Sequence, residues 1–323
     1  MNKDINQRHL KRLFYLLRDR GLLIMCLLAL VSLLNFFEVN QGARGMVQGA
    51  LIDIEKRTPP PLAETINSLP ILSDSDLALT AQAALVFDLD NNRLVYAVNA
   101  EKRLPVASLT KLTTALLASR HLSPDQVIAV NEQNIANIAS PRLGLVLGEQ
   151  ISVAALMEGM LVASANDAAE VLAAAIGGGD RQKTIVMMNS LALNLGLRDT
   201  SYANPTGFDD PKAYSTAKDI LALVLEIGRN PWLVSVLSET GGQVTSVDGR
   251  YSHSFNTTNS LLRNSHQYVT GGKTGYTDEA RGNLVVFAEN MKGTQMAAVV
   301  LGSDDREADM SRLLELTFNK YDF

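Results

Sequence analysis

Three short segments of the 323-residue chain carry side chains that together could perform acyl transfer. The first reads Ser-x-x-Lys over residues 108–111, the second reads Ser-x-Asn over 164–166, and the third reads Lys-Thr-Gly over 273–275. A serine hydroxyl attacks a carbonyl carbon when a neighbouring base removes its proton, and a lysine amine can be that base. Taken as one site, the segments predict an acyl-transfer enzyme that needs no histidine.

The context of the first segment places Ser108 as the nucleophile and Lys111 as the base. Ser108 follows the helix-breaking stretch 105–107 and opens an apolar run with helical spacing, so we expect it at a helix N-terminus. Backbone N–H groups without intrahelical partners point outward there and can stabilise an oxyanion. Lys111 lies nearly beneath Ser108. Its pKa, about 10.4 in water, must be lowered by burial and a nearby cation before the amine accepts a proton, and Lys273 is the candidate cation.

The second segment is expected in the connection between two helices. An apolar run over residues 151–163 precedes it, and an Ala-rich run follows it as far as Ile176. Alternate residues there can present a hydroxyl and an amide to one cleft, so Ser164 would relay protons and Asn166 would hold a substrate amide. For Asp167 we favour helix capping or packing.

The third segment is predicted to lie on an edge strand, because it follows a glycine pair and precedes the strand candidate 283–289. Gly275 would leave space for an extended peptide that adds to the sheet edge. Thr274 can hydrogen-bond a terminal carboxylate that Lys273 attracts. The N–H of Tyr276 is a candidate second oxyanion donor beside that of the nucleophile.

Single motifs prove little here, because the chain repeats two of them. Residues 215–218 also read Ser-x-x-Lys, and residues 254–256 also read Ser-x-Asn. The order and local context of the three segments therefore decide the interpretation.

Composition limits the function classes. A hydrophobic content of 46% over this length allows one substantial core. Residues 1–20 carry a net charge of +4, which leaves −9 for the remainder of a chain with net charge −5, and nothing in that acidic remainder suggests nucleic-acid binding. Cys26 is the only cysteine, so disulfides are excluded beyond it. His253 and His266 lack ligand spacing, so we expect no metal or other cofactor.

Residues 21–37 form an almost uninterrupted apolar stretch after the basic N-terminus. Its length falls between that of a signal-peptide core and the ~20 residues of a membrane span. The preceding basic residues predict that the following domain faces outward. We favour an uncleaved anchor; cleavage at residues 47–49 is the alternative, and a mature N-terminus near Ala50 would establish it.

The order of the expected elements predicts an α+β fold, with a mostly antiparallel sheet flanked by helices and an all-helical subdomain. Strand candidates 83–88 and 93–98 form a hairpin. Helices dominate from Ser108 to about Leu237, and further strand candidates precede a last helix from Arg306 to Phe318. We divide the chain into a basic cytoplasmic N-terminus (1–20), a membrane anchor or signal segment (21–37), a Pro-containing linker (38–80) and a catalytic domain (81–323).

From roughly residue 80 to 320, the chain resembles the low-molecular-mass penicillin-binding proteins of the D-alanyl-D-alanine carboxypeptidase family, which have a β-lactamase/transpeptidase-like fold. The resemblance extends beyond the three motifs and covers residues 105–112, 162–169, 204–208, 214–219, 256–259 and 272–277. Ser215 to Lys218 matches a family helix start, which explains the first repeated motif.

The resemblance implies a serine peptidase that attacks the D-Ala–D-Ala bond of a peptidoglycan stem peptide, releases the terminal D-alanine and hydrolyses the acyl-enzyme. β-Lactam antibiotics would be covalent inhibitors. The location implied is the bacterial cell envelope, on the extracytoplasmic face of the inner membrane or in the periplasm. The roles implied are Ser108 as nucleophile, Lys111 as base, Ser164 as proton shuttle, Asn166 as positioner of substrate and lysine, and Lys273 with Thr274 as carboxylate clamp.

Three other functions remain open or are disfavoured. A D,D-endopeptidase that cleaves peptidoglycan crosslinks would use the same machinery. A catalytically idle wall-binding protein is disfavoured because all the reactive side chains are present. A class A β-lactamase would need a deacylating glutamate, and the corresponding stretch 198–204 has none. One departure from the family concerns the cleft: Arg281 stands where many relatives have glycine.

Overall fold

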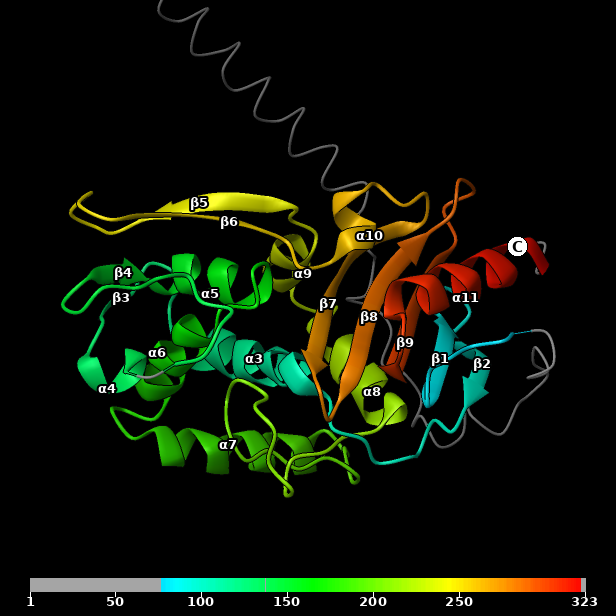
Figure 1. Ribbon diagram of the computed structural model, residues 1–323, viewed down its shortest axis with the longest axis horizontal. Helices are drawn as coiled ribbons and strands as arrows, with labels where there is room; N and C mark the ends of the chain where they lie inside the picture. Colours follow the sequence, from blue (N-terminus) through cyan, green and yellow to red (C-terminus); the bar gives the residue numbers. More distant parts are fainter. Residues whose placement is uncertain (1–76, 137, 321–323) are drawn as a thin grey trace, which may run out of the picture. The chain divides into compact units, whose positions relative to one another are not determined.

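The centre of the fold is an antiparallel five-stranded sheet (Figure 1). The computed structural model describes residues 77–136 and 138–320, so the predictions for 1–20, 21–37 and nearly all of the linker 38–80 lie outside the described residues. The predicted α+β fold with a mostly antiparallel sheet is confirmed. In spatial order, the strands are β2 (Arg93–Val98), β1 (Ala83–Asp88), β9 (Gln295–Ser303), β8 (Arg281–Glu289) and β7 (Val269–Thr277).

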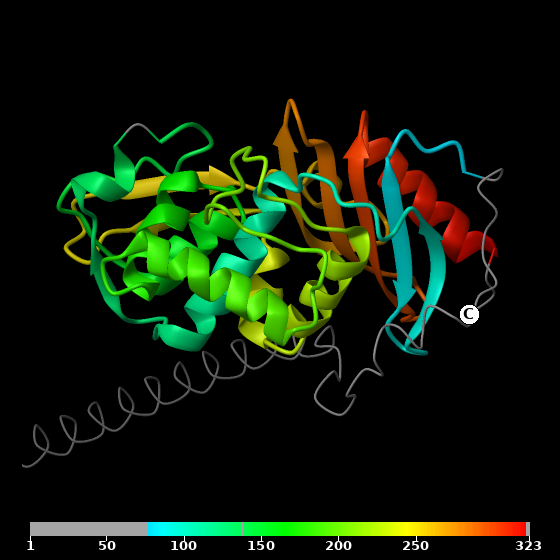
Figure 2. The ribbon, with the colours of Figure 1, turned by 90° about the horizontal axis from the view of Figure 1, so that it is seen from below.

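Helices cover both faces of this sheet (Figure 2). Helix α8 (Ala217–Ile227) packs on one face and α11 (Arg306–Lys320) on the other. Strand β1 is buried along its whole length, since Leu85 faces the core shared with α8 and Val86 faces the core shared with α11. This double burial is why β1 reads as an unbroken apolar run instead of an alternating one.

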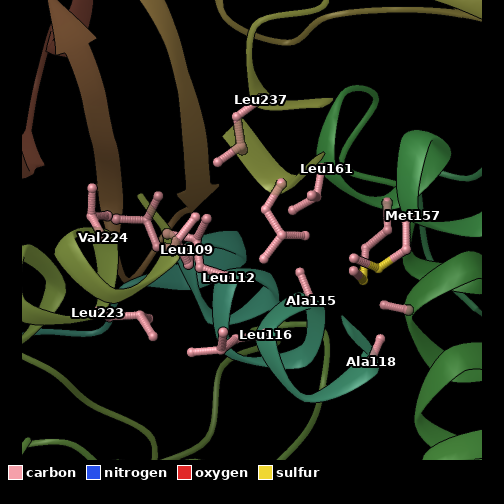
Figure 3. Packing of buried hydrophobic residues seen from close by; sticks show 14 of the residues in the cluster. Leu109, Leu112, Ala115, Leu116, Ala118, Met157, Leu161, Leu223, Val224 and Leu237 are labelled. Atoms are coloured by element: carbon pink, nitrogen blue, oxygen red, sulfur yellow. The ribbon is translucent and has the colours of Figure 1, made fainter. Parts of the chain in front are cut away.

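Helix α3 (Lys111–His121) forms the middle of a helical subdomain beside the sheet (Figure 1). Its first eight residues are all buried, and its leucines pack against α5, α8 and α9 (Figure 3). Burial of a leucine side chain contributes about 1.5–3 kcal/mol, so α3 is held firmly on all sides. The surrounding helices are α4 (Glu132–Ile135), α5 (Val153–Leu161), α6 (Asn166–Ile176), α7 (Arg181–Asn194) and α9 (Pro231–Leu237).

Short elements account for most differences from the predicted pattern. The helix expected over 151–163 begins only at Val153, because Ile151 pairs with Ile128 in a two-stranded sheet. Sequence reasoning missed that sheet since each of its strands has three residues, too few for a periodic signal. The short elements are β3 (Val127–Ala129), β4 (Gln150–Ser152), β5 (Gly241–Thr245), β6 (Ser252–Asn256) and α10 (Ser260–Arg263).

No single helix in residues 77–136 and 138–320 combines the length and hydropathy needed to cross a membrane. Helices α8 and α9 meet these criteria only as a pair, which bends by 117° at the break between them.

Candidate active site

Ser108 lies in a 3-10 turn, η3 (Ala107–Thr110), immediately before α3. Ser108 therefore lies at a helix N-terminus as predicted, although this first turn is 3-10 and the α-helix begins at Lys111. The turn is entered through Ala107, whose φ of 47° lies in the left-handed region. This geometry brings Nζ of Lys111 to 2.8 Å from Oγ of Ser108. Nucleophile and candidate base are in hydrogen-bond contact, as the sequence predicts.

Ser164 and Lys273 form a second hydroxyl–amine pair. Ser164 lies between α5 and α6 as predicted, and its φ of 61° is also left-handed. Lys273 lies on β7, at the edge of the sheet, and its Nζ donates to Oγ of Ser164 at 2.8 Å and to the carbonyl oxygen of Thr274 at 3.0 Å. Lys273 therefore contacts the proposed proton relay directly.

Both lysine side chains are buried, and each lies where a positive charge is disfavoured. Lys111 is 0% and Lys273 1% exposed. Burial lowers the pKa of Lys111 well below its usual value, the charge of Lys273 lowers it further, and Glu170 acts in the opposite direction. Burial, and to a smaller degree Arg306, lowers the pKa of Lys273 to about 7. Desolvation thus favours the neutral amine that a base requires, as predicted for Lys111.

Asn166 and Asp167, the first residues of α6, hold the loop beside the site. The side-chain Nδ2 of Asn166 donates to the carbonyl oxygen of Ala139 at 3.0 Å. The carboxylate of Asp167 accepts the N–H groups of Leu143, Gly144 and Leu145, which agrees with the structural role expected for it. The role of Asn166 in positioning substrate and lysine stays a prediction.

The approach of β7 to the nucleophile explains Gly275. A Cβ atom at this position would lie 2.7 Å from the carbonyl oxygen of Val106 and 3.1 Å from the backbone nitrogen of Ser108. Its missing side chain therefore allows β7 to touch the nucleophile turn, and the expectation that Gly275 also leaves space for substrate stays a prediction. The side chain of Tyr276 is 64% exposed at the same strand edge.

The comparisons with known proteins agree with this geometry. The family model described as D-alanyl-D-alanine carboxypeptidase matches residues 71–305. The chain belongs to this family. Its relatives include D-alanyl-D-alanine carboxypeptidase DacF of Bacillus subtilis, 31% identical over 77% of this chain and 64% of that protein. A D-alanyl-D-alanine endopeptidase of Pseudomonas aeruginosa is 30% identical over 79% of this chain and 80% of that protein.

Solved structures share the fold of this family member. A D-alanyl-D-alanine carboxypeptidase from Mycobacterium tuberculosis superimposes with a TM-score of 0.68 at 26% identity, covering 78% of this chain and 94% of that one. A mutant of the Streptomyces K15 DD-transpeptidase gives a TM-score of 0.69 at 25% identity, covering 75% and 99%. Against the first curated relatives, the chain spans less than two thirds of their length, between 63% and 64%.

Sequence reasoning missed several residues that complete the site of this D-alanyl-D-alanine carboxypeptidase family member. Nζ of Lys111 also donates to the carbonyl oxygen of Thr206 at 2.6 Å. Arg306, at the start of α11, donates from Nη1 to the carbonyl oxygen of Gly275 at 3.0 Å. The hydroxyl of Thr258 lies 2.5 Å from that of Thr274. No local pattern marks Arg306, whereas Thr206 and Thr258 lie in segments that carry the family resemblance.

The repeated Ser-x-x-Lys motif at residues 215–218 is structural. Ser215 is fully buried, and its hydroxyl lies 2.8 Å from that of Thr200. Lys218 instead reaches Glu101 at 2.8 Å, so this serine and lysine do not form a second reactive pair. His253, interpreted above as structural or surface, is buried, with Nε2 2.8 Å from the carboxylate of Glu149, a partner too distant in sequence for spacing to reveal.

Proposed function

We propose that this protein is a serine D,D-carboxypeptidase that removes the terminal D-alanine from peptidoglycan stem peptides through an acyl-enzyme. The 2.8 Å contact between Nζ of Lys111 and Oγ of Ser108 carries the proposal, because this amine is buried and its lowered pKa favours the neutral form. Membership of the D-alanyl-D-alanine carboxypeptidase family supports the choice of substrate.

Acylation follows from the geometry of the first pair. Oγ of Ser108 bonds to the carbonyl carbon of the D-Ala–D-Ala linkage while its proton passes to Nζ of Lys111. The N–H groups of Ser108 and Tyr276 donate to the oxyanion that forms. Thr274 hydrogen-bonds the terminal carboxylate, which the positive charges of Lys273 and Arg306 attract.

The second pair returns the proton. Ser164, held by Lys273, gives its proton to the leaving nitrogen and recovers the proton that Lys111 took from Ser108, so the C–N bond breaks, D-alanine departs with a neutral amine and Lys111 is again a free base. Water then attacks the ester, Lys111 accepts the water proton, and that proton returns to Oγ of Ser108. The products are the shortened peptide, D-alanine and regenerated enzyme.

The deciding experiment incubates the protein with a synthetic pentapeptide ending in D-Ala–D-Ala and measures free D-alanine. Labelled penicillin, whose strained amide the same nucleophile attacks, should form a stable adduct at Ser108, and Ser108→Ala should abolish both signals. Adduct formation that survives this substitution would refute the nucleophile. Absence of D-alanine release from any pentapeptide, together with unlabelled Ser108, would refute the function.

A D,D-endopeptidase is the second candidate, since the chain matches 80% of the Pseudomonas endopeptidase but only 64% of the Bacillus carboxypeptidase. An endopeptidase needs an open cleft for a crosslinked amide in place of the terminal D-alanine. Mass spectrometry of peptidoglycan digests separates the two: loss of crosslinked dimers indicates the endopeptidase, and loss of terminal D-alanine from monomers indicates the carboxypeptidase.

The proposed location is the extracytoplasmic face of the bacterial inner membrane, with the apolar segment 21–37 as anchor. The six basic residues before this segment support the orientation. Peptidoglycan substrates and β-lactams would both reach the catalytic domain there. Recovery of the full-length protein in the membrane fraction, accessible to protease only from the periplasmic side, is the expected result; a soluble periplasmic form beginning near Ala50 would replace the anchor by a cleaved signal.

A further inference from the structure

The turn from Asn204 to Phe208 lies against both reactive residues of the nucleophile region. Gly207 in this turn has a φ of 88°, and a Cβ atom there would lie 1.9 Å from the carbonyl oxygen of Ala107, so only glycine fits this approach. On α3, Thr114 donates to the carbonyl oxygen of Pro205 at 2.8 Å and Lys111 donates to the next carbonyl, that of Thr206. Two residues one helical turn apart thus bind two successive carbonyls of the turn.

Asn204 holds this turn together. Its Oδ1 accepts from the backbone N–H groups of Thr206, Gly207 and Phe208, at 3.2, 2.7 and 3.0 Å. It also accepts from the hydroxyl of Thr206 at 2.9 Å, while its Nδ2 donates to the carbonyl oxygen of Phe208 at 2.9 Å. The side chain is 9% exposed. One amide therefore determines where the Thr206 carbonyl points.

The Thr206 carbonyl controls the orientation of the lysine amine. A neutral amine has two N–H groups and one lone pair, and the lone pair must face the hydroxyl of Ser108 to accept its proton. Since a carbonyl oxygen can only accept, Lys111 must direct an N–H towards Thr206 at 2.6 Å. This contact restricts rotation about the last bond of the side chain, which lets the lone pair face Ser108. A base oriented by a third group is the general arrangement of activated serine nucleophiles.

We propose that Asn204 is a positioning residue for the reaction: through the backbone carbonyl of Thr206, it orients the amine of Lys111 towards Ser108. The proposal rests on the acyl-transfer function proposed above and adds the group that orients the base. The neutrality of asparagine belongs to this role. An aspartate would accept the same donors, but its negative charge beside Lys111 would hold a proton on the amine and would leave the Phe208 carbonyl without its donor.

The first test compares the rate constant of penicillin acylation in Asn204→Ala with that of the unaltered protein. Misplacement of a reacting group by about 1 Å costs on the order of 100-fold in rate, so we expect a loss of about 30- to 100-fold. The dissociation constant of the non-covalent penicillin complex should stay within about threefold, because Asn204 acts on the base and not on ligand binding.

Asn290→Ala is the matched control. Asn290 anchors the turn between β8 and β9 in the same manner, with Oδ1 accepting from the N–H groups of Lys292 and Thr294 at 3.0 and 2.9 Å. We expect this variant to lose a similar amount of thermal stability while acylating at the unaltered rate. If both variants lose acylation in proportion to stability, or if folded Asn204→Ala acylates within about threefold of the unaltered protein, the proposal is overturned.

Asn204→Asp provides a readout that a purely structural role would not change. The charged groups that act on Lys111 are Lys273 on β7 and Glu170 on α6, and the latter is paired with Arg181 of α7. A new carboxylate adds to the effect of Glu170 and raises the pKa of Lys111, so the acylation rate should begin to rise only at higher pH. An unshifted pH profile contradicts the proposal.

The outcomes separate this inference from the proposed function. An unaltered protein that neither reacts with penicillin nor releases D-alanine overturns both. A reactive unaltered protein with equally reactive Asn204 variants overturns the positioning role alone and leaves the carboxypeptidase in place.

Discussion

Two buried charged regions of this molecule are built in opposite ways. At the candidate active site, Lys111 and Lys273 bring two amines into the interior, and among the described residues no carboxylate lies within ion-pair distance of either amine. Beneath α11, the carboxylate of Asp309 is equally buried but accepts the N–H and hydroxyl of Thr80 and the hydroxyl of Ser303.

This difference in compensation distinguishes a region suited to reactivity from one that contributes to stability. A buried charge is costly unless hydrogen bonds or an opposite charge compensate it, so the charged forms of the lysines are disfavoured while the carboxylate of Asp309 is compensated. The candidate active site also holds Ala107 and Ser164 in left-handed backbone conformations, which cost of order 1 kcal/mol or more each. The molecule gives up stability at the site where an unprotonated amine is needed.

The largest expected effect comes from Lys111→Met, which keeps the length of the side chain and removes the amine. Without the base, the rate constant of penicillin acylation should fall by about 100- to 10,000-fold. The folded state should gain stability, because a disfavoured buried amine is replaced by an apolar group. Rapid-mixing acylation kinetics and thermal unfolding measure both quantities; a near-normal acylation rate would remove Lys111 as the base.

Lys273→Met tests the same comparison through the pH dependence of the unfolding free energy. The pKa of Lys273 is about 7 in the folded state against its ordinary value of 10.5, so between these values the unfolded chain binds a proton that the folded protein does not. The free energy of unfolding of the unaltered protein, relative to the variant, should therefore rise as pH increases from about 7 to 10.5, by about 4–5 kcal/mol. Denaturant titrations of both proteins across this range test the sign, and a pH-independent difference would contradict the burial argument.

Asp309→Ala tests the compensated region. The substitution leaves the N–H of Thr80 and the buried hydroxyl of Ser303 without their acceptor, which should cost about 1–3 kcal/mol of unfolding free energy. The acylation rate constant at low temperature should stay within about threefold of that of the unaltered protein, because Asp309 stabilises the fold and does not contact the reacting groups. A large loss of acylation without a loss of stability would remove the distinction between the two regions.

Arg281→Gly should have the smallest effect. Arg281 has a φ of 57° at the start of β8, a conformation that suits glycine, and its half-exposed side chain pairs with Asp304. Loss of an exposed ion pair costs about 0–1 kcal/mol, and relief of backbone strain offsets it, so stability should change by less than about 1 kcal/mol. A much larger change in unfolding free energy would show that exposed charge matters here as much as buried charge.

The amino-acid sequence alone predicted the candidate reactive side chains, the family and most of the large elements. The hairpin of β1 and β2 was predicted with its observed bounds, and β7 was predicted as an edge strand. The position of Ser164 between two helices was also predicted. These features are local: each depends on periodicity, breaker residues or a motif within about ten residues, so the linear pattern contains the information.

The tertiary structure decided which groups meet. The carbonyl of Thr206 is a backbone atom 95 positions from Lys111, Arg306 reaches Gly275 across 31, and His253 finds Glu149 across 104. The sequence cannot indicate which backbone carbonyl orients the base, because every residue has a backbone carbonyl. The close approach of β7 to Ser108 likewise adds a packing reason for Gly275 that the sequence did not reveal. The sequence determined which reactive groups this protein has. Long-range packing determined the proton affinity and the orientation of the Lys111 amine, because both properties depend on burial and on neighbours that only folding brings together.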